Sequence, residues 1–422
     1  MLAQSIAQAR EAIASDTDDR DAQLQKILRI VRSHLNMEVA FLSEFSQGRR
    51  YFRFVDTKDR PVIAVGGSDP LEDSYCQRVV DGRLPQLMRD AGRNAEALRL
   101  PATRSMPVGA HMSIPVKLSD GSLYGTLCCF SAETDDSLNE RDLSVLKAFG
   151  AIVSELISMT ALQNARLDEI RARIARVISE RSFESYYQPI YRVADNHLLG
   201  FEALTRFKGL PYRSPDVWLH EADEAGMSVE LEYAMAEMAL VGLQQISPGA
   251  TVSINLSPEA IMMPRLTDLL GRVPLRRIIL EITEHAAVSD YAALNATLAP
   301  YREQGLRIAA DDAGAGYSCF RHVLELRPDV IKLDLSLTRN IDKDSARAAL
   351  ASALTIFGRS IDAEIVAEGV ETITELGVMR EIGVTKVQGY LLGKPGPISV
   401  AARLPMIAPI DLAPYEMTLR SA

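Results

Sequence analysis

Seven apolar segments in the C-terminal half of the sequence each lead into a carboxylate, amide or amine side chain. From Asn255 onward these polar residues are 20 to 36 residues apart, close to the length of a strand–helix–strand unit. Repeated units of this length predict a closed barrel of parallel strands, whose C-terminal ends converge on one mouth. The polar residues are Glu202, Asn255, Glu281, Asp311, Lys332, Glu368 and Gln388.

The most informative segment, 308–318, reads IAADDAGAGYS. Its apolar residues run into two adjacent acids, Asp311 and Asp312, which repel each other and are costly to bury unless a cation neutralises them. An isolated Asp-Asp-x-Gly sequence is often only a turn. The recurrence of polar residues at the other strand ends instead indicates a cation-binding site.

Length and charge limit the remaining possibilities. A chain of 422 residues is too long for one compact core, so two domains and a connector are expected. The net charge of -10 argues against broad binding to nucleic-acid polymers or anionic membranes, because phosphate attraction requires a surplus of Lys and Arg. A small phosphorylated ligand held through metal ions remains compatible with this charge.

The sequence favours a reduced, cytoplasmic setting. The four cysteines form no CxxC pair and no regular framework. The N-terminal segment carries charges throughout and lacks the apolar core of a signal peptide. The longest apolar stretch, 148–162, contains Glu155 and several hydroxyl side chains, so we expect it to be too polar to span a bilayer.

Residues 20–158 predict an α/β sensory domain. A helical pattern is followed by two strands around Gln47 and Gly48, a helical middle, and a second hairpin around Asp120 and Gly121. This order, with the segments SYC (74–76), VVDG (79–82) and GTLCCF (125–130), resembles the GAF family. The resemblance implies an α/β sandwich that receives an unknown small-molecule or redox input, or that only relays a signal.

Four residues of this domain, three cysteines and one histidine, could carry chemistry. Cys76 could be a redox or chromophore-linking thiol, although a buried structural cysteine is the more common case. Cys128 and Cys129 are adjacent on a predicted strand, so they should face opposite sides of the sheet. His111, at the start of a strand, is expected to be a polar residue with its hydrogen bonds satisfied.

A connecting helix is predicted over 141–180. Apolar positions from Phe149 to Val177 alternate by four and three residues, with polar Thr160 and Gln163 in the same seam. This spacing favours a two-stranded coiled coil that pairs two chains into a homodimer and transmits a signal. The alternative is a single amphipathic helix lying on its own domain.

The C-terminal motifs resemble the EAL family of cyclic-di-GMP phosphodiesterases over residues 181–407. The motifs, in order, are EALTR (202–206), NLS (255–257), EITE (281–284), DDAGAGYS (311–318), IKLD (331–334), AEGVE (367–371) and QGYLLGKP (388–395). The resemblance implies a TIM-barrel-like domain that hydrolyses cyclic di-GMP to linear pGpG with two Mg²⁺ or Mn²⁺ ions.

The same resemblance implies roles for individual residues. The ligands of the first metal would be Glu202, Asn255, Glu281 and Asp311, and those of the second Asp311, Asp312 and Glu368. Lys332 would orient or activate the attacking water, and Glu202 and Glu368 would share in catalysis. Gln188, Arg206 and Gln388 would contact the substrate or the water network, and Glu284 would anchor the loop 313–318.

The types of these residues, considered without the resemblance, also suit a site for two divalent metal ions. Dense oxygen ligands suit Mg²⁺ or Mn²⁺, whereas Zn²⁺ would favour His or Cys. The chain departs from the family pattern at Ala313, Cys319 and Leu392, where Phe, Ser and Phe are common. Since the first of these removes an aromatic loop anchor, we expect a fragment from about residue 180 to turn over more slowly than the full chain.

Two rival functions remain. A non-hydrolysing EAL module would bind cyclic di-GMP as a sensor, but such modules usually lack one or more metal-binding acids, and here every matched position is intact. A purely structural scaffold would leave the clustered acids unexplained.

Overall fold

The structure, a computed structural model, describes residues 20–58, 63–105, 108–209, 211–283, 288, 290–313 and 319–408. The packing of the chain separates it into two compact units, Met1–Arg166 and Leu167–Ala422. The boundary falls inside one long helix, α5 (Glu140–Ser179), so each unit contains part of that helix.

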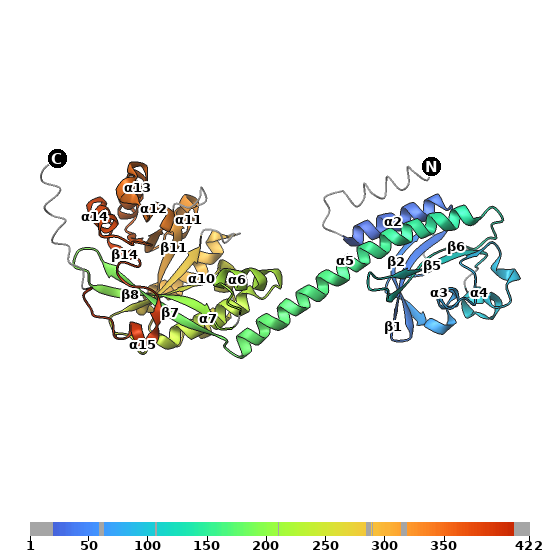
Figure 1. The fold of residues 1–422 in the computed structure, drawn as a ribbon, viewed down its shortest axis with the longest axis horizontal. Coiled ribbons are helices and arrows are strands. Elements are labelled where there is room, and N and C mark those ends of the chain that lie inside the picture. The colour runs from blue at the N-terminus through green and yellow to red at the C-terminus, as the bar shows by residue number, and fades with distance from the viewer. Residues whose placement is uncertain are drawn as a thin grey trace. The chain divides into compact units, whose positions relative to one another are not determined.

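An antiparallel six-stranded sheet forms the centre of the N-terminal unit, in the order β3-β2-β1-β6-β5-β4. Helix α2 (Arg20–His34) and the first part of α5 cover one face, and α3 (Tyr75–Val80) and α4 (Pro101–Ser105) lie against the other (Figure 1). The strands are β1 (Val39–Ser46), β2 (Arg49–Thr57), β3 (Ser68–Pro70), β4 (Leu87–Met88), β5 (Ala110–Lys117) and β6 (Leu123–Ser131). The predicted α/β sandwich is confirmed.

Local sequence explains the pairing in this sheet. Gln47 and Gly48 both have positive φ angles, 50° and 72°, which a two-residue turn between antiparallel strands requires. Cys128 packs on the α3 side and Cys129 on the α2 side, as their adjacent positions on β6 predict. The expectation for His111 is wrong, because its buried Nδ1 has no hydrogen-bond partner among the described residues.

Helix α5 is packed differently at its two ends. Phe149 and Val153 are buried in the N-terminal unit, whereas Ile170 and Ile174 are buried in the C-terminal unit. The uninterrupted seam predicted from the heptad spacing is therefore occupied at both ends by the chain itself. The middle of the seam, at Thr160 and Gln163, is more accessible, and the exposed large apolar side chains Met159 and Leu162 lie beside the seam rather than in it.

By length and composition alone, α5 could also cross a membrane, contrary to the expectation from its polar residues. Of its most apolar 18-residue window, 44% is buried inside the structure, and a single helix of this kind is weak evidence for a membrane span.

Eight strands close the barrel of the C-terminal unit, from β7 through β14, and β14 pairs back with β7. The strands are β7 (Phe183–Arg192), β8 (Leu198–Phe207), β9 (Thr251–Asn255), β10 (Ile278–Thr283), β11 (Arg307–Ala313), β12 (Val330–Leu333), β13 (Glu364–Ala367) and β14 (Lys386–Gln388). A short ninth strand, β15 (Gly396–Pro397), pairs with β7. The predicted TIM-barrel-like fold is confirmed.

One strand departs from the all-parallel barrel that the sequence predicts. Strand β7 runs antiparallel to both of its neighbours, β8 and β14. The link from β7 to β8 is a short turn that includes Asn196 with φ at 53°, too short for the crossover that parallel neighbours need. The remaining neighbours in the ring are parallel.

Helices surround the outside of the barrel and bury its outer apolar face (Figure 1). Their bounds are α6 (Pro215–Glu224), α7 (Ser228–Gly242), α8 (Pro258–Ile261), α9 (Arg265–Leu270), α10 (Tyr291–Glu303), α11 (Cys319–Leu326), α12 (Leu335–Thr338), α13 (Ser345–Ser360), α14 (Ile373–Ile382) and α15 (Ile398–Ala401). The main C-terminal core lies between this helical layer and the strands.

Candidate active site

An apolar layer inside the barrel supports the polar residues at its mouth. The members of this layer form a buried cluster of their own: Ile190, Ile279, Ala309, Val330 and Val366. Side chains two residues apart on a strand share a face, so the residues that follow by two lie directly above this layer. They are Glu281, Asp311, Lys332 and Glu368. On antiparallel β7 the order is reversed, and Gln188 precedes Ile190 by two.

Lys332 lies at the centre of this polar layer. Its Nζ is 2.7 Å from Glu281 Oε2, 2.7 Å from Glu368 Oε1, 3.0 Å from Asp311 Oδ1 and 3.4 Å from Glu202 Oε1. The residue is 1% exposed. Four carboxylates thus face one ammonium group, and the excess negative charge is of the kind that further cations neutralise.

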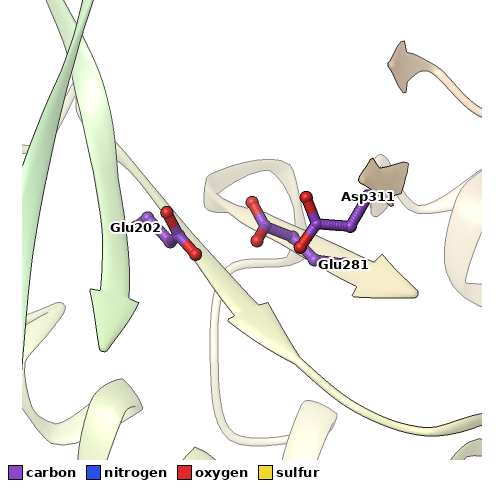
Figure 2. A group of neighbouring side chains, drawn as sticks. All are labelled: Glu202, Glu281 and Asp311. Atoms are coloured by element: carbon purple, nitrogen blue, oxygen red, sulfur yellow. The ribbon is translucent and has the colours of Figure 1, made fainter. Parts of the chain in front are cut away.

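The carboxylates form two overlapping groups. Ligand atoms of Glu202, Glu281 and Asp311 all lie within 4.8 Å of one another, and so do those of Asp311, Asp312 and Glu368. Figure 2 shows the first group, with side chains from three strands directed toward one another. Asp311 belongs to both groups, so two cations bound there could share it as a ligand.

Burial dominates the electrostatics of this cluster. It raises the pKa of Glu281 well above its ordinary range and the pKa of Glu368 to about 8, although Lys332 opposes both shifts. Burial would lower the pKa of Lys332, but the surrounding carboxylates together raise it well above its usual range. Lys332 therefore remains an ammonium group at neutral pH.

Asp312 adopts a backbone conformation that most residues avoid. Its φ is 57°, in the left-handed region where Asp and Asn are among the better-tolerated non-glycine residues. Its amide N–H donates to Asp311 Oδ1 at 3.0 Å. This geometry ends the regular pairing of β11 with β12, which shifts register between Ala310 and Ala313.

A chain of amides connects the cluster to β7. Gln388 Nε2 donates to Gln188 Oε1 at 3.0 Å and also to Glu202 Oε2. Gln188 Nε2 in turn donates to Gly393 O at 3.3 Å. Gln388 Oε1 is buried without a hydrogen-bond partner among the described residues, which leaves it able to accept a bond from a water or substrate.

Asn255 and Arg206 lie nearer the rim than the carboxylates. Asn255 ends β9, is paired in register with Glu281, and is exposed. Arg206 is half-buried on β8, its Nη1 donates to Thr205 O, and its guanidinium lies 5.8 Å from the ring centre of Tyr186. The structure therefore places both at the barrel mouth but brings neither into the buried cluster.

Some of the predicted positions lie outside the described residues. These are Glu284, residues 314–318 of the loop, and the side chain of Cys319. Of the two remaining departures from the family pattern, Ala313 is fully buried beside Leu333 of β12, and Leu392 belongs to the main C-terminal core.

Two residues that hold the backbone near site residues were not predicted from the sequence. Glu232 of α7 accepts the backbone N–H of Ser257 at 2.7 Å and so fixes the turn that follows Asn255. The hydroxyl of Thr338 donates to the carbonyl of Glu368. Neither has a local sequence signal, since each acts across more than twenty residues of sequence. The Ser257-Pro258 pair is a recognisable helix start, but it does not indicate Glu232.

A large cavity of the C-terminal unit lies at the other end of the barrel. It has a volume of about 570 Å³ and is lined by strand-start residues such as Arg307, Glu364 and Lys386. None of the clustered carboxylates lines it. We place the candidate site at the carboxylate cluster instead, because active sites of TIM barrels lie at the C-terminal ends of the strands.

The fold and the cluster first define a class, a TIM-type barrel with an acidic centre at the C-terminal ends of its strands. The sequence model of the EAL domain matches residues 171–395, and that of the GAF domain matches residues 17–158. The chain belongs to the EAL domain family, and a GAF domain precedes its EAL domain.

Known relatives agree with this assignment. The probable cyclic di-GMP phosphodiesterase PdeD of Escherichia coli K12 is 32% identical over 232 residues, which cover 52% of this chain and 43% of PdeD. An uncharacterized signaling protein of Caulobacter vibrioides is 29% identical over 346 residues, 80% of this chain and 38% of the relative. The chain thus spans less than half the length of these curated relatives.

A solved structure, titled PaMucR phosphodiesterase in complex with c-di-GMP, resembles the C-terminal unit. It has a TM-score of 0.50 and 27% sequence identity, and the match covers 55% of this chain and 99% of the solved chain.

Proposed function

We propose that the EAL domain hydrolyses cyclic di-GMP to linear pGpG and that the GAF domain, residues 20–158, regulates it. The observation that carries this proposal is the convergence of buried carboxylates on Lys332 at the barrel mouth. The names of similar proteins, a probable cyclic di-GMP phosphodiesterase and a phosphodiesterase complex with c-di-GMP, support the choice of substrate.

The donor set fits two Mg²⁺ or Mn²⁺ ions. All the clustered side chains offer oxygen, the ligand that these cations prefer. Glu202, Asn255, Glu281 and Asp311 would hold one ion, and Asp311, Asp312 and Glu368 the other. Such ions supply Lewis acidity, which stabilises phosphodiester charge and activates water.

Lys332 would act through its fixed positive charge. Its ammonium group holds the acids of several strands at one point, because their charges would otherwise repel each other. The same charge favours the deprotonated form of a water placed beside it. Because Lys332 is buried beneath the barrel mouth, bulk solvent would not reach its ammonium group.

The amide chain would position water and substrate. Gln388 is held by Gln188 and Glu202, so its Oε1, which has no partner among the described residues, has a fixed direction in which to accept a hydrogen bond. Arg206, nearer the rim, carries a charge suited to the phosphate of a cyclic dinucleotide. These contacts would orient the scissile phosphodiester over the acidic cluster.

The test compares two glutamates at opposite ends of β13. Glu368 belongs to the carboxylate cluster, whereas Glu364 lies at the far end of the strand and pairs with Arg307 at 3.0 Å. We expect Glu368→Gln to lower pGpG formation at least about 100-fold and Glu364→Gln to leave it nearly unchanged. Equal turnover by both variants would contradict the assignment. Tight binding of cyclic di-GMP by the wild type without any product would support the non-hydrolysing sensor.

The proposal extends to a cytoplasmic homodimer. The exposed Met159 and Leu162 in the middle of α5 support pairing of two chains over that short segment. Light scattering of the full chain at micromolar concentration tests this part, and a monomer would contradict it. A cytoplasmic location is supported by three buried free thiols in the N-terminal unit.

A further inference from the structure

Two buried cysteines of the GAF domain are in direct contact. Cys76 lies on α3 and Cys128 on β6, and their Sγ atoms are 3.3 Å apart. Both side chains are fully buried. Although 52 residues separate them in sequence, the fold brings the two thiols within reach of each other.

An arginine is held against the first of these thiols. Arg50 Nη1 is 3.0 Å from Cys76 Sγ, and the Arg50 side chain is itself 4% exposed. Its Nε donates to Asp69 Oδ1 at 3.0 Å, and its guanidinium lies 4.6 Å from the ring centre of Phe52. A buried guanidinium fixed in this way stabilises a thiolate beside it.

The two thiols are electrostatically different. Burial would raise the pKa of Cys76, but hydrogen bonding with Cys128 and the charge of Arg50 lower it to about 6. Burial raises the pKa of Cys128 well above its usual range, and the neighbouring Cys76 adds to this shift. Cys76 is thus the more acidic of the two thiols and loses its proton before Cys128 does.

Polar contacts distinguish this pair from ordinary core cysteines, which act as small apolar side chains. Cys128 Sγ lies 3.0 Å from Ser113 Oγ and 3.2 Å from Thr126 Oγ1. Cys129, the next residue on β6, packs among apolar side chains on the opposite face, and burial raises its pKa to about 12. It is therefore a matched control within the same strand.

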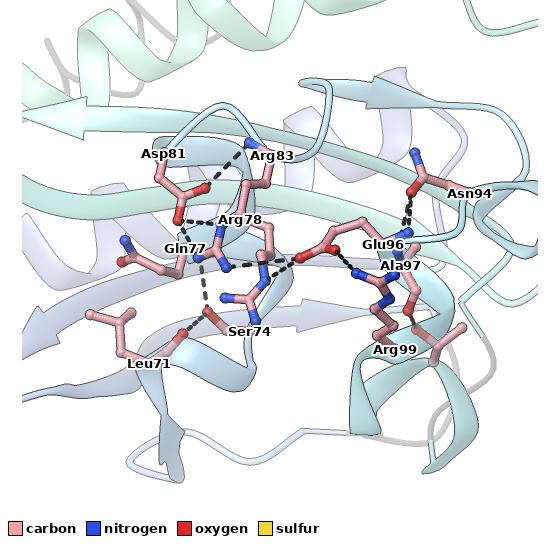
Figure 3. A network of polar contacts seen from close by, with 11 residues as sticks. Leu71, Ser74, Gln77, Arg78, Asp81, Arg83, Asn94, Glu96, Ala97 and Arg99 are labelled. Carbon is pink, nitrogen blue, oxygen red and sulfur yellow. Dashed lines mark hydrogen bonds and ion pairs between the residues drawn. The ribbon is translucent and has the colours of Figure 1, made fainter.

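The helix that carries Cys76 is firmly placed. Ser74 caps α3 by accepting the backbone N–H of Gln77 at 3.1 Å. Arg78 on the same helix pairs with Glu96 at 2.9 Å, in the polar network drawn in Figure 3. These contacts hold Cys76 against β6 rather than leaving its position to a mobile loop.

A small cavity lies beside Arg50, the residue that contacts Cys76 Sγ. It has a volume of about 20 Å³, and Arg50, Tyr75 and His111 are among its lining residues. A volume of this size admits one water-sized molecule. The cavity is therefore large enough for one water next to the guanidinium that contacts Cys76, although neither cysteine is among its lining residues.

We propose that Cys76 and Cys128 form a peroxide-reactive dithiol site. The Cys76 thiolate attacks one peroxide oxygen, the O–O bond breaks, and Cys76 becomes a sulfenic acid as hydroxide leaves. Cys128 then attacks this sulfur, an S–S bond forms, and the hydroxyl group leaves with the Cys128 proton as water. The peroxide supplies the oxidising equivalents. This site goes beyond the proposed function and does not depend on phosphodiesterase activity.

The test treats the reduced full chain with hydrogen peroxide, blocks the remaining thiols and digests it with trypsin. Cleavage after Lys and Arg leaves Cys76 in the peptide 59–78, while Cys128 and Cys129 share the peptide 118–141. We expect these two peptides to be linked, and the link to disappear on reduction. Because one peptide contains both candidate partners, single variants must identify the second cysteine.

Cys129→Ser should form the linked peptides as the wild type does, and Cys128→Ser should lose them. In Cys128→Ser, Cys76 should instead be trapped by a sulfenic-acid reagent such as dimedone. Thermal unfolding of each reduced variant checks that it is folded. The proposal is overturned if the folded wild type forms no link, if Cys128→Ser still forms it, or if peroxide carries Cys76 only to its sulfinic acid.

Discussion

Lys332 Nζ lies 2.7 Å from Glu281 Oε2, and the two side chains are 2% and 1% exposed. They come from β12 and β10, strands that are separated by β11 in the barrel. An ion pair at this depth is costly to form, since both groups lose their hydration. It persists because Lys332 also neutralises carboxylates from β8, β11 and the end of β13.

Replacing Lys332 should therefore destabilise the metal-free protein. Lys332→Met leaves several buried carboxylates without a countercharge, and we expect a loss of about 3–5 kcal/mol in the free energy of unfolding. Urea denaturation in a chelator, followed by the fluorescence of the single Trp218, measures this loss.

Lys386→Met provides the control for that experiment. Lys386 is also buried, but its partner Glu364 is 44% exposed, so we expect a smaller cost of about 1 kcal/mol. Added Mn²⁺ should recover part of the stability of Lys332→Met. Equal losses in both variants would contradict the central role of Lys332.

Asp312 separates a backbone requirement from a charge requirement. Asn tolerates the φ of 57°, so Asp312→Asn should keep the wild-type stability, whereas Asp312→Ala should lose about 1 kcal/mol or more. Both variants remove the carboxylate and should lose most turnover and one Mn²⁺ equivalent. Chemical denaturation, turnover and Mn²⁺ titration test these expectations. Full activity in Asp312→Asn would show that the charge is not needed.

The C-terminal unit should depend on the last turns of α5. Ile170, Ile174 and Val177 are buried against a cluster that includes Trp218, and each buried side chain of this size contributes roughly 1.5–3 kcal/mol. A fragment 167–422 should therefore unfold at a clearly higher urea concentration than a fragment 181–422.

The comparison of the two fragments also matters for the prediction that the GAF domain regulates turnover. A fragment from about residue 180 would turn over slowly for a packing reason alone, so the effect of the GAF domain must be measured on the 167–422 fragment. Identical unfolding midpoints for the two fragments would show that the helix end contributes nothing.

Acid should destabilise the N-terminal unit through His111. Burial first, and then the charge of Arg50, lower the pKa of His111 to about 3, below its ordinary value of 6.5. Between these values the unfolded state binds a proton that the folded state does not, so stability is lost as the pH falls.

The expected loss is about 2 kcal/mol between pH 7 and pH 5, and His111→Gln should lack this component. Urea denaturation by circular dichroism measures it. Because Trp218 lies in the C-terminal unit, a transition without a fluorescence change belongs to the N-terminal unit. Parallel pH profiles of the wild type and the variant would contradict the prediction.

The barrel and its mouth could be predicted because their signals are local. On β10 to β13 the polar residue stands two positions beyond an apolar one, so Glu281 and Asp311 follow from strand periodicity and the convergence of parallel strands. The sequence also contains a signal for the antiparallel β7. The segment 193–197 between β7 and β8 is too short for the crossover connection that parallel strands need.

Contacts between distant segments could not be predicted. No local pattern indicates that Lys332 meets acids from four other strands or strand ends, that Asn255 is exposed, or that Cys76 touches Cys128. The heptad spacing of α5 was ambiguous for a related reason. Apolar residues such as Ile174 show the same spacing whether they pack on a second chain or on their own domain.

The most direct test of the account is the metal dependence of cyclic di-GMP turnover by the full chain. Product should be absent in excess chelator and should appear as linear pGpG when Mn²⁺ or Mg²⁺ is restored, with Glu364→Gln active and Glu368→Gln nearly inactive. Formation of pGpG in chelator, or binding of cyclic di-GMP without product in the presence of either metal, would contradict it.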